Sequence, residues 1–128
     1  MLSLAERIRA DEGIDDVVRI GIGGSGLGPE LVLQALVANR SCRQCIHVVS
    51  NLDGHALQEV LTGLDASRTL FIVVSKSWST AETLLNAASA AAWFRDNGGG
   101  DMARHFVAVS ARTGPTGHRP LAPAWCST

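Results

Sequence analysis

Two short polar loops hold the groups in this sequence that are best suited to bind an anion. The first, residues 23–25, reads Gly-Gly-Ser and offers an almost bare backbone with one hydroxyl. The second, residues 75–80, reads Ser-Lys-Ser-Trp-Ser-Thr and offers four hydroxyls and one ammonium group. Exposed backbone N–H groups, hydroxyls and a positive charge, without a cluster of metal ligands, suit a phosphate monoester. The side chains concerned are those of Ser25, Ser75, Lys76, Ser77, Ser79 and Thr80.

Both loops also have a purely structural interpretation. Glycines after a strand can serve only to make a tight turn, and hydroxyls before a helix can serve only to cap it. Ser79, with Glu82 three residues later, has the spacing of a capping box, so we expect Ser79 to cap the helix that follows. Because two such loops are expected at the same edge of one sheet, we favour the interpretation that they form an anion site over the interpretation that they are two unrelated turns.

The loops need a scaffold, and the apolar pattern predicts one in which strands and helices alternate. We expect strands over residues 17–22, 46–49, 70–74 and 105–109, and helices over residues 3–12, 29–38, 53–61 and 80–97. Glycines at residues 63 and 98–100 should end two of these helices.

Alternation of this kind predicts an α/β fold with a mainly parallel sheet and right-handed crossovers. Strand 70–74 is apolar at every position, which is typical of a central strand covered on both faces. Ligands bind such sheets at the carboxyl ends of the strands, and both polar loops lie there, each before a helix N-terminus that favours an anion.

The glycines after the first strand also match the dinucleotide-binding fingerprint G-x-G-x-x-G, over residues 21–26. That fingerprint requires an acidic residue at the end of the second strand, to hold the ribose hydroxyls. The second strand ends instead in Ser50 and Asn51, and Asp53 is better placed to cap the next helix. An NAD-type dinucleotide-binding domain is therefore the weaker alternative.

Other side chains with catalytic or metal-binding chemistry are sparse. Cys42 and Cys45 have C-x-x-C spacing, but there is no second pair. Neither His47 nor His55 has ligand spacing to these thiols, so we expect no metal site. We interpret His55 as an exposed helix residue. Glu82 is the one carboxylate near the predicted anion, and its capping role already accounts for it.

Composition excludes several classes of partner. The 128 residues suffice for one domain, and 46% hydrophobic residues argue against disorder. With a net charge of -1, the chain has no excess of positive charge to attract the phosphate backbone of a nucleic acid. No apolar run approaches the roughly 20 residues that span a bilayer, and the charged N-terminus is not a signal peptide. Three cysteines fit a reducing compartment. We therefore expect a cytoplasmic protein that binds neither nucleic acid nor membrane.

Four segments resemble the glucose-6-phosphate isomerase family. Residues 20–29, IGIGGSGLGP, are similar to that family's IGIGGSxLGP loop, and residues 73–87, VVSKSWSTAETLLNA, are similar to its SKTFTTxET segment. Residues 48–61 and 105–110 resemble the segments between and after these, in the right order. The resemblance implies a three-layer, flavodoxin-like sandwich of the sugar-isomerase (SIS) type.

The same resemblance implies an activity and a set of ligands. The parent enzyme would be a homodimer without a cofactor that interconverts glucose 6-phosphate and fructose 6-phosphate. The residues implied to bind the substrate phosphate are Gly24, Ser25, Ser75, Lys76, Ser77, Trp78, Ser79 and Thr80.

The sequence departs from the family pattern at several positions. Gly26 stands where aspartate is usual, Trp78 where phenylalanine is usual and Ala81 where glutamine is usual. Ser77 and Ser79 replace threonines and keep the hydroxyls. The phosphate-binding groups are thus retained, whereas Ala81 removes a polar contact.

The motifs that the family uses for catalysis do not occur in these 128 residues. The family's base is a glutamate in a Q-x-G-V-E motif, and a G-G-R-[YF]-S motif supplies an arginine; neither is found here. The resemblance ends after Ser110, and residues 111–128 hold three of the four prolines and no acidic residue.

We therefore expect residues 1–110 to form a partial SIS sugar-phosphate-binding domain and residues 111–128 to be a tail, disordered or translated out of frame. On this hypothesis the chain is an N-terminal fragment of an isomerase that binds sugar phosphate and has no catalytic residue of its own. A stand-alone SIS module that senses phosphosugars is the alternative.

Overall fold

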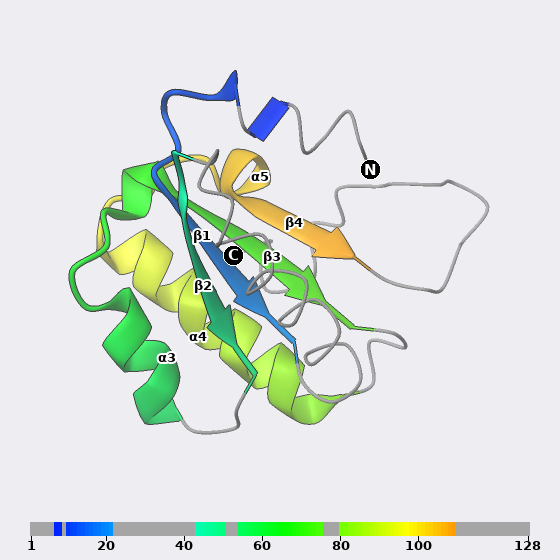
Figure 1. The fold of residues 1–128 in the computed structure, drawn as a ribbon. Helices are drawn as coiled ribbons and strands as arrows, with labels where there is room; N and C mark the ends of the chain where they lie inside the picture. The colour runs from blue at the N-terminus through cyan, green and yellow to red at the C-terminus, as the bar shows by residue number, and fades with distance from the viewer. Residues whose placement is uncertain (1–6, 9, 22–42, 51–53, 76–79, 110–128) are drawn as a thin grey trace.

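The chain forms a parallel β-sheet with helices packed against it (Figure 1). The computed structural model describes residues 7–8, 10–21, 43–50, 54–75 and 80–109. The strands are β1 (Asp16–Ile20), β2 (Cys45–Val49), β3 (Thr69–Val74) and β4 (Phe106–Val109). They lie in the order β2-β1-β3-β4, and each neighbouring pair is parallel. The predicted α/β fold with a parallel sheet is confirmed.

The described connections between strands are helical. β2 leads through α3 (Gly54–Leu61) and the 3₁₀ helix η1 (Ala66–Arg68) to β3, and β3 leads through α4 (Ala81–Asp96) and α5 (Met102–His105) to β4. Helices α3 and α4 cover the same face of the sheet (Figure 1). None of the helices in the described ranges is long and apolar enough to cross a bilayer.

The predicted elements agree with the observed ones where they can be compared. The four strands, α3 and α4 lie where the sequence predicts them, with ends displaced by no more than two residues. The helix predicted over residues 29–38 lies outside the described residues, as do residues 3–6 and 9 of the first predicted helix. Of the other residues of that first helix, 7, 8 and 10 are helical and 11 and 12 are not. The short η1 and α5 were not predicted.

The two inner strands, β1 and β3, are buried on both faces of the sheet. Toward α3 and α4, Val18, Ile20 and Phe71 form one apolar cluster together with residues of the two helices. On the opposite face, Val17 and Leu70 belong to a second cluster. Successive residues of a strand point to opposite faces, so β1 and β3 each contribute to both clusters. Because β3 lies between β1 and β4 and is covered on both faces, the prediction that it is central is confirmed.

An aromatic cluster fixes α4 to the sheet. The Phe71 ring of β3 stacks on the Phe106 ring of β4, with centroids 4.6 Å apart and planes 13° apart. The Phe94 ring of α4 meets Phe71 edge-on, at 6.3 Å and 90°. The Trp93 ring approaches Phe71 from the same helix, at 6.2 Å and 68°. Stacked and edge-to-face arrangements of this kind are the favoured ones for aromatic pairs.

Three consecutive glycines follow α4, and they have two different physical roles. Gly98 and Gly100 have φ angles of 72° and 83°, in the left-handed region that favours glycine. The N–H of Gly99 donates to the carbonyl of Phe94 at 2.8 Å, and a Cβ at Gly99 would lie 2.4 Å from carbons of the Phe94 ring. The predicted helix end is therefore confirmed, and Gly99 is required by packing.

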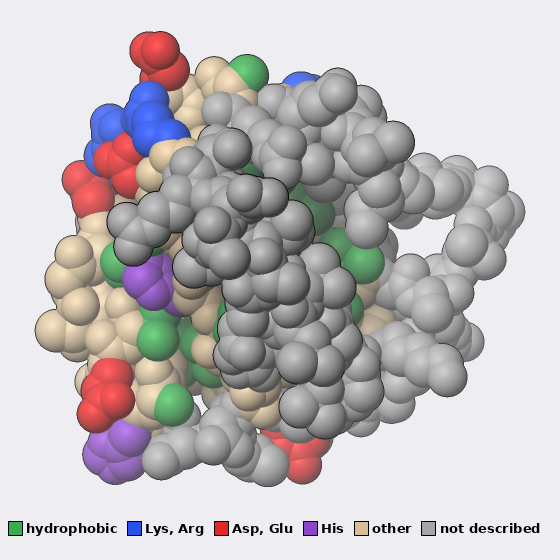
Figure 2. Space-filling model, in the orientation of Figure 1, with side chains coloured by type: hydrophobic (Ala, Val, Ile, Leu, Met, Phe, Trp, Pro, Cys, Tyr) green, Lys and Arg blue, Asp and Glu red, His purple; other side chains and the backbone are tan. Residues whose placement is uncertain are grey.

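A charged network ties together the amino ends of three strands. Arg43, just before β2, and Arg68, just before β3, each donate from Nη2 to Oδ1 of Asp15 at 2.9 Å, and Arg68 donates to Oδ2 as well. Both arginines also donate to the carbonyl of Glu12, at 2.8 and 3.1 Å. Acidic and basic side chains gather at this end of the molecule (Figure 2). Hydrogen bonds from Arg68, and then from Arg43, hold the pKa of the Asp15 carboxyl far below its ordinary value of 3.8.

This network makes a pH-dependent contribution to stability. Since the pKa of Asp15 is lowered on folding, the stabilisation should be complete above about pH 5 and should fade as the pH drops below 3.8 toward the folded-state pKa. Asp15→Asn should therefore lower the melting temperature by a few degrees at pH 7, and the difference from the unmodified chain should shrink at pH 2.5. The effect is small because all three side chains are partly solvent-exposed.

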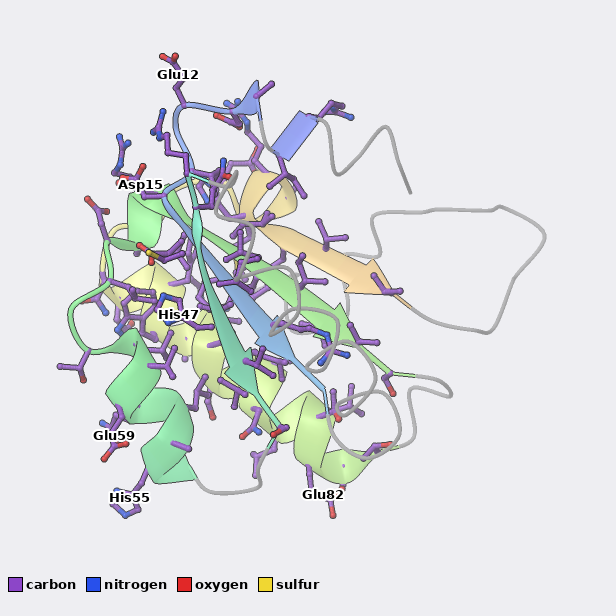
Figure 3. All side chains as sticks on the ribbon, viewed as in Figure 1. Glu12, Asp15, His47, His55, Glu59 and Glu82 are labelled. Atoms are coloured by element: carbon purple, nitrogen blue, oxygen red, sulfur yellow. The ribbon has the colours of Figure 1, made fainter. Side chains whose placement is uncertain are left out.

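Thermal unfolding at pH 7 and pH 2.5 checks this prediction. Glu59→Gln on the exposed surface of α3 removes the same charge without touching the network and serves as the control (Figure 3). A difference between Asp15→Asn and the unmodified chain that stays constant between the two pH values would contradict the assignment.

Candidate functional site

The carboxyl ends of β1 and β3 lie side by side, and both predicted loops start there. The strand order places β2 on one side of β1 and β3 on the other, so the chain leaves β1 and β3 toward opposite edges of the sheet. Such a switch point is where open parallel sheets bind ligands. Gly21 follows β1 directly, and Ser75 follows β3 directly. The prediction that the strands before the two loops end at the same edge of one sheet is confirmed, and residues 23–25 themselves lie outside the described residues.

Gly21 allows the two strand ends to approach closely. Its N–H donates to the carbonyl of Val49 at 3.1 Å, so the hydrogen-bonding of β1 with β2 extends one residue beyond the strand. A Cβ at Gly21 would lie 3.1 Å from the carbonyl oxygen of Val74. A side chain there would push on the backbone of β3, so glycine allows the end of β1 to lie close against the end of β3.

Ser75 is buried at the end of β3, and its backbone is hydrogen-bonded to β4. It is only 3% exposed, and its N–H donates to the carbonyl of Val109 at 3.0 Å, which extends the pairing of β3 with β4. The second loop therefore begins from a fixed backbone position beside β4.

Thr80, at the other end of the second loop, is the N-cap of α4. It has an extended backbone, with φ −78° and ψ 104°, and its carbonyl accepts the N–H of Leu84 at 3.2 Å. The prediction that Ser79 is the cap is therefore wrong by one residue. Glu82 is the second residue of the helix, so it cannot complete the predicted capping box with Ser79. It still lies in the first turn, where the helix dipole favours a negative charge.

The Thr80 hydroxyl is not used to cap the helix. Among the residues that the structure describes, it makes no capping hydrogen bond with the first turn of α4. A threonine at this position thus presents a hydroxyl and the N-terminal end of a sixteen-residue helix at the carboxyl edge of the sheet. The remaining predicted phosphate ligands lie outside the described residues: Gly24, Ser25, Lys76, Ser77, Trp78 and Ser79.

The other chemically active side chains lie away from this edge or point away from it. His55 is exposed on α3, as predicted, and Figure 3 shows it directed outward. Glu82 lies at the N-terminal end of α4 with its carboxylate directed away from the sheet (Figure 3). Cys45 is exposed on the edge strand β2. In the part of the chain that the structure describes, no three histidine, cysteine or acidic side chains come together to hold a metal ion.

One charged residue close to the end of β1 was not predicted as part of the site. Arg19 lies inside β1, is 7% exposed, and pairs in register with Val48 and Ile72. A charged residue inside an otherwise apolar strand, two positions before a glycine loop, is the signal that could have found it, since arginine is seldom buried.

The family of the chain follows from its similarity to known proteins. A sequence model of the family described as phosphoglucose isomerase matches residues 3–117. The chain belongs to the phosphoglucose isomerase family. The resemblance read from its two loops is thereby confirmed.

Relatives within the phosphoglucose isomerase family are close in sequence. The glucose-6-phosphate isomerases of Methylibium petroleiphilum and Albidiferax ferrireducens are 54% and 52% identical to this chain, over 112 and 110 residues and 86% of the chain in each case. The chain spans 21% of the length of each of these relatives.

Solved structures agree in fold. A crystal structure of a glucose-6-phosphate isomerase from Chlamydia trachomatis superposes with a TM-score of 0.78 and 37% identity, over 90% of this chain and 22% of that one. A hypothetical protein from Thermus thermophilus superposes with a TM-score of 0.74 and 37% identity, over 89% of this chain and 27% of that one. The four-stranded parallel sheet is therefore a fold that members of the family share.

Proposed function

We propose that this chain binds the phosphate group of glucose 6-phosphate and fructose 6-phosphate, as part of a glucose-6-phosphate isomerase. The observation that carries the proposal is the close approach of Gly21, after β1, to Val74, the last residue of β3, at the switch point of the sheet, in a chain of the phosphoglucose isomerase family. The proposed ligands are Gly24, Ser25, Ser75, Lys76, Ser77, Trp78, Ser79 and Thr80.

The chemistry of the two loops suits binding of a phosphate dianion. An oxyanion can accept hydrogen bonds from the backbone N–H groups of a glycine-rich turn and from hydroxyls. The N-terminus of α4 adds a positive electrostatic potential. Charge-assisted hydrogen bonds of this kind are stronger than neutral ones. Phosphate contacts hold substrate and transition state alike, so they position the sugar without accelerating the proton transfer between its carbons.

We further propose that these 128 residues alone bind the sugar phosphate without isomerising it. A general base must lie within hydrogen-bonding reach of the proton that it removes. Glu82, which lies in the first turn of α4, directs its carboxylate away from the sheet (Figure 3). The Q-x-G-V-E and G-G-R-[YF]-S motifs that the resemblance assigns to catalysis do not occur in this sequence.

The remaining parts of the proposal rest on the family resemblance and on the composition of the chain. The full-length enzyme would be a cytoplasmic homodimer that requires no cofactor, binds neither nucleic acid nor membrane, and uses residues 1–110 as the sugar-phosphate-binding unit. Residues 111–128 would take no part in binding.

A double variant, Ser77→Ala with Thr80→Ala, tests the second loop. Each hydrogen bond to a charged group is worth about 1.5–3 kcal/mol, so the double variant should bind fructose 6-phosphate at least about tenfold more weakly. Isothermal titration calorimetry measures the affinity, and NAD serves as the competing ligand that should not bind.

Ser89→Ala is the matched control, because Ser89 is an exposed hydroxyl on the same helix and distant from the loop. It should leave the affinity unchanged. If the double variant binds fructose 6-phosphate with unchanged affinity, the second loop is not part of the phosphate site. Binding of NAD in place of fructose 6-phosphate would overturn the proposed function, and conversion of fructose 6-phosphate to glucose 6-phosphate by the chain would overturn the proposal that it binds without isomerising.

A further inference from the structure

Asn97 and Gly98 form an exposed asparagine–glycine pair at the end of α4. Asn97 is the C-cap of the helix, and both residues are exposed to solvent. The other asparagines of the sequence, Asn39, Asn51 and Asn86, are followed by arginine, leucine and alanine. Since glycine has no Cβ, the backbone nitrogen that follows Asn97 is the least hindered of the four. The asparagine side chain most open to attack by the backbone is therefore that of Asn97.

The backbone nitrogen of Gly98 is loosely held. Its N–H donates to the carbonyl of Arg95 at 3.4 Å, which is longer than the roughly 2.7–3.2 Å of an ordinary hydrogen bond. By contrast, the N–H of Gly99 donates to the carbonyl of Phe94 at 2.8 Å. A Cβ at Gly98 would meet no atom of the described residues within 4 Å, so the turn has open space on this side. The nitrogen of Gly98 is therefore more easily released than that of Gly99.

The side chain of Asn97 makes one hydrogen bond to α4. Its Nδ2 donates to the carbonyl of Trp93 at 2.8 Å, and its backbone N–H donates to the same carbonyl at 3.0 Å. The side-chain bond is exposed, so water competes for both of its groups and its net contribution to stability is small. Helix ends open locally without unfolding of the whole domain. Opening of the last turn therefore suffices to free the amide of Asn97.

Cyclisation of this pair follows a balanced route. The backbone nitrogen of Gly98 gives up its proton and forms a bond to Cγ of Asn97, the Cγ–Nδ2 bond breaks, and Nδ2 leaves with that proton as ammonia. The product is a succinimide ring. Water then opens the ring at one of its two carbonyls and yields aspartate or isoaspartate. Water is the only co-reactant that these steps consume.

The product would weaken the end of α4. A carboxylate has no N–H to donate to the carbonyl of Trp93, so two acceptors would face each other. It also places a negative charge at the C-terminal end of the helix, next to Asp96, where the helix dipole disfavours it. Isoaspartate lengthens the backbone before Gly98 and would displace Gly99, which packs against the ring of Phe94.

We propose that Asn97 is a site of spontaneous deamidation in the folded protein, by cyclisation onto Gly98, and that this modification loosens the C-terminal end of α4. The change is irreversible and accumulates with the age of the protein. It does not depend on the proposed function, because none of the residues concerned belongs to the proposed sugar-phosphate site.

Peptide mass spectrometry of the full chain, incubated near neutral pH and then digested, measures the loss of each asparagine amide. A synthetic peptide of residues 92–102 gives the rate without the fold. We expect Asn97 in the folded chain to convert within about a hundredfold of the rate in the peptide, because only the last helical turn has to open. Asn86, which is 4% exposed, should keep its amide. Asn97→Gln is the matched control, since glutamine keeps the amide but must close a larger ring.

A second measurement tests the effect on α4. Asn97→Asp, which carries the charge of the product, should lower the melting temperature of the chain by a few degrees at pH 7. A melting temperature equal to that of the unmodified chain would overturn the proposed loosening of α4. Conversion at Asn97 more than about a hundredfold slower than in the peptide would overturn the modification site, because protection of about a thousandfold or more is what a requirement for global unfolding imposes.

Discussion

Phe71→Ala should lower the free energy of unfolding by about 3–5 kcal/mol, because a fully buried phenylalanine loses both its transfer free energy and its packing partners. The ring is 0% exposed, stacks on Phe106 and meets Phe94 and Trp93. Its removal would leave a cavity between β3, β4 and α4. Since a domain of this size has about 5–15 kcal/mol of stability in total, the variant should be close to unfolding.

Urea denaturation followed by circular dichroism measures this effect. Leu85→Ala is the control, because Leu85 is an equally apolar residue on α4 but is 63% exposed, and its loss should change stability by no more than about 0.5 kcal/mol. A Phe71→Ala variant that loses no more than the Leu85→Ala variant would show that the aromatic cluster does not hold α4 to the sheet.

The strands and long helices were predictable because local patterns determine them. The run of apolar residues in β3 predicts a strand buried on both faces, and the structure places it between β1 and β4. The glycines after α4 likewise predict its end. By contrast, α5 has only four residues, too few for a helical period to appear.

The capping of α4 shows how a correct pattern can be misplaced by one residue. The sequence S-T-A-E holds two adjacent hydroxyl residues, and either can cap a helix. Spacing to Glu82 favoured Ser79, whereas the observed N-cap is Thr80. Local spacing alone does not decide which backbone carbonyl accepts the first helical hydrogen bond.

The features that sequence patterns missed depend on contacts between distant residues. Asp15 meets Arg43 and Arg68 across 28 and 53 positions of the chain. Arg19 looks like an interruption of an apolar strand until the packing of β1 against β3 shows where its guanidinium lies. The position of the candidate site followed from the strand–loop–helix pattern, whereas the sequence marks Arg19 only as a charge in an apolar strand and the fold shows that its guanidinium lies beside Gly21 and Val74.

Gly99→Ala should destabilise the chain by about 1–3 kcal/mol or more, because the new methyl group overlaps the ring of a core residue. A Cβ at Gly99 would lie 2.4 Å from carbons of Phe94, a contact that folded proteins do not tolerate without rearrangement. The Phe94 ring is fully buried and packs against Phe71 and Phe106, so it has no open space into which to move.

Two comparisons isolate this overlap from the general effect of replacing glycine. Gly54→Ala, in the first turn of α3, meets no atom within 4 Å and should be neutral or stabilising by up to about 1 kcal/mol, because alanine restricts the unfolded chain. Combining Gly99→Ala with Phe94→Leu should cost less than the sum of the two single changes, since a smaller residue at 94 relieves the overlap. Urea denaturation of the four variants measures both effects. Strict additivity would mean that the cost at Gly99 comes from its backbone conformation and not from the Phe94 ring.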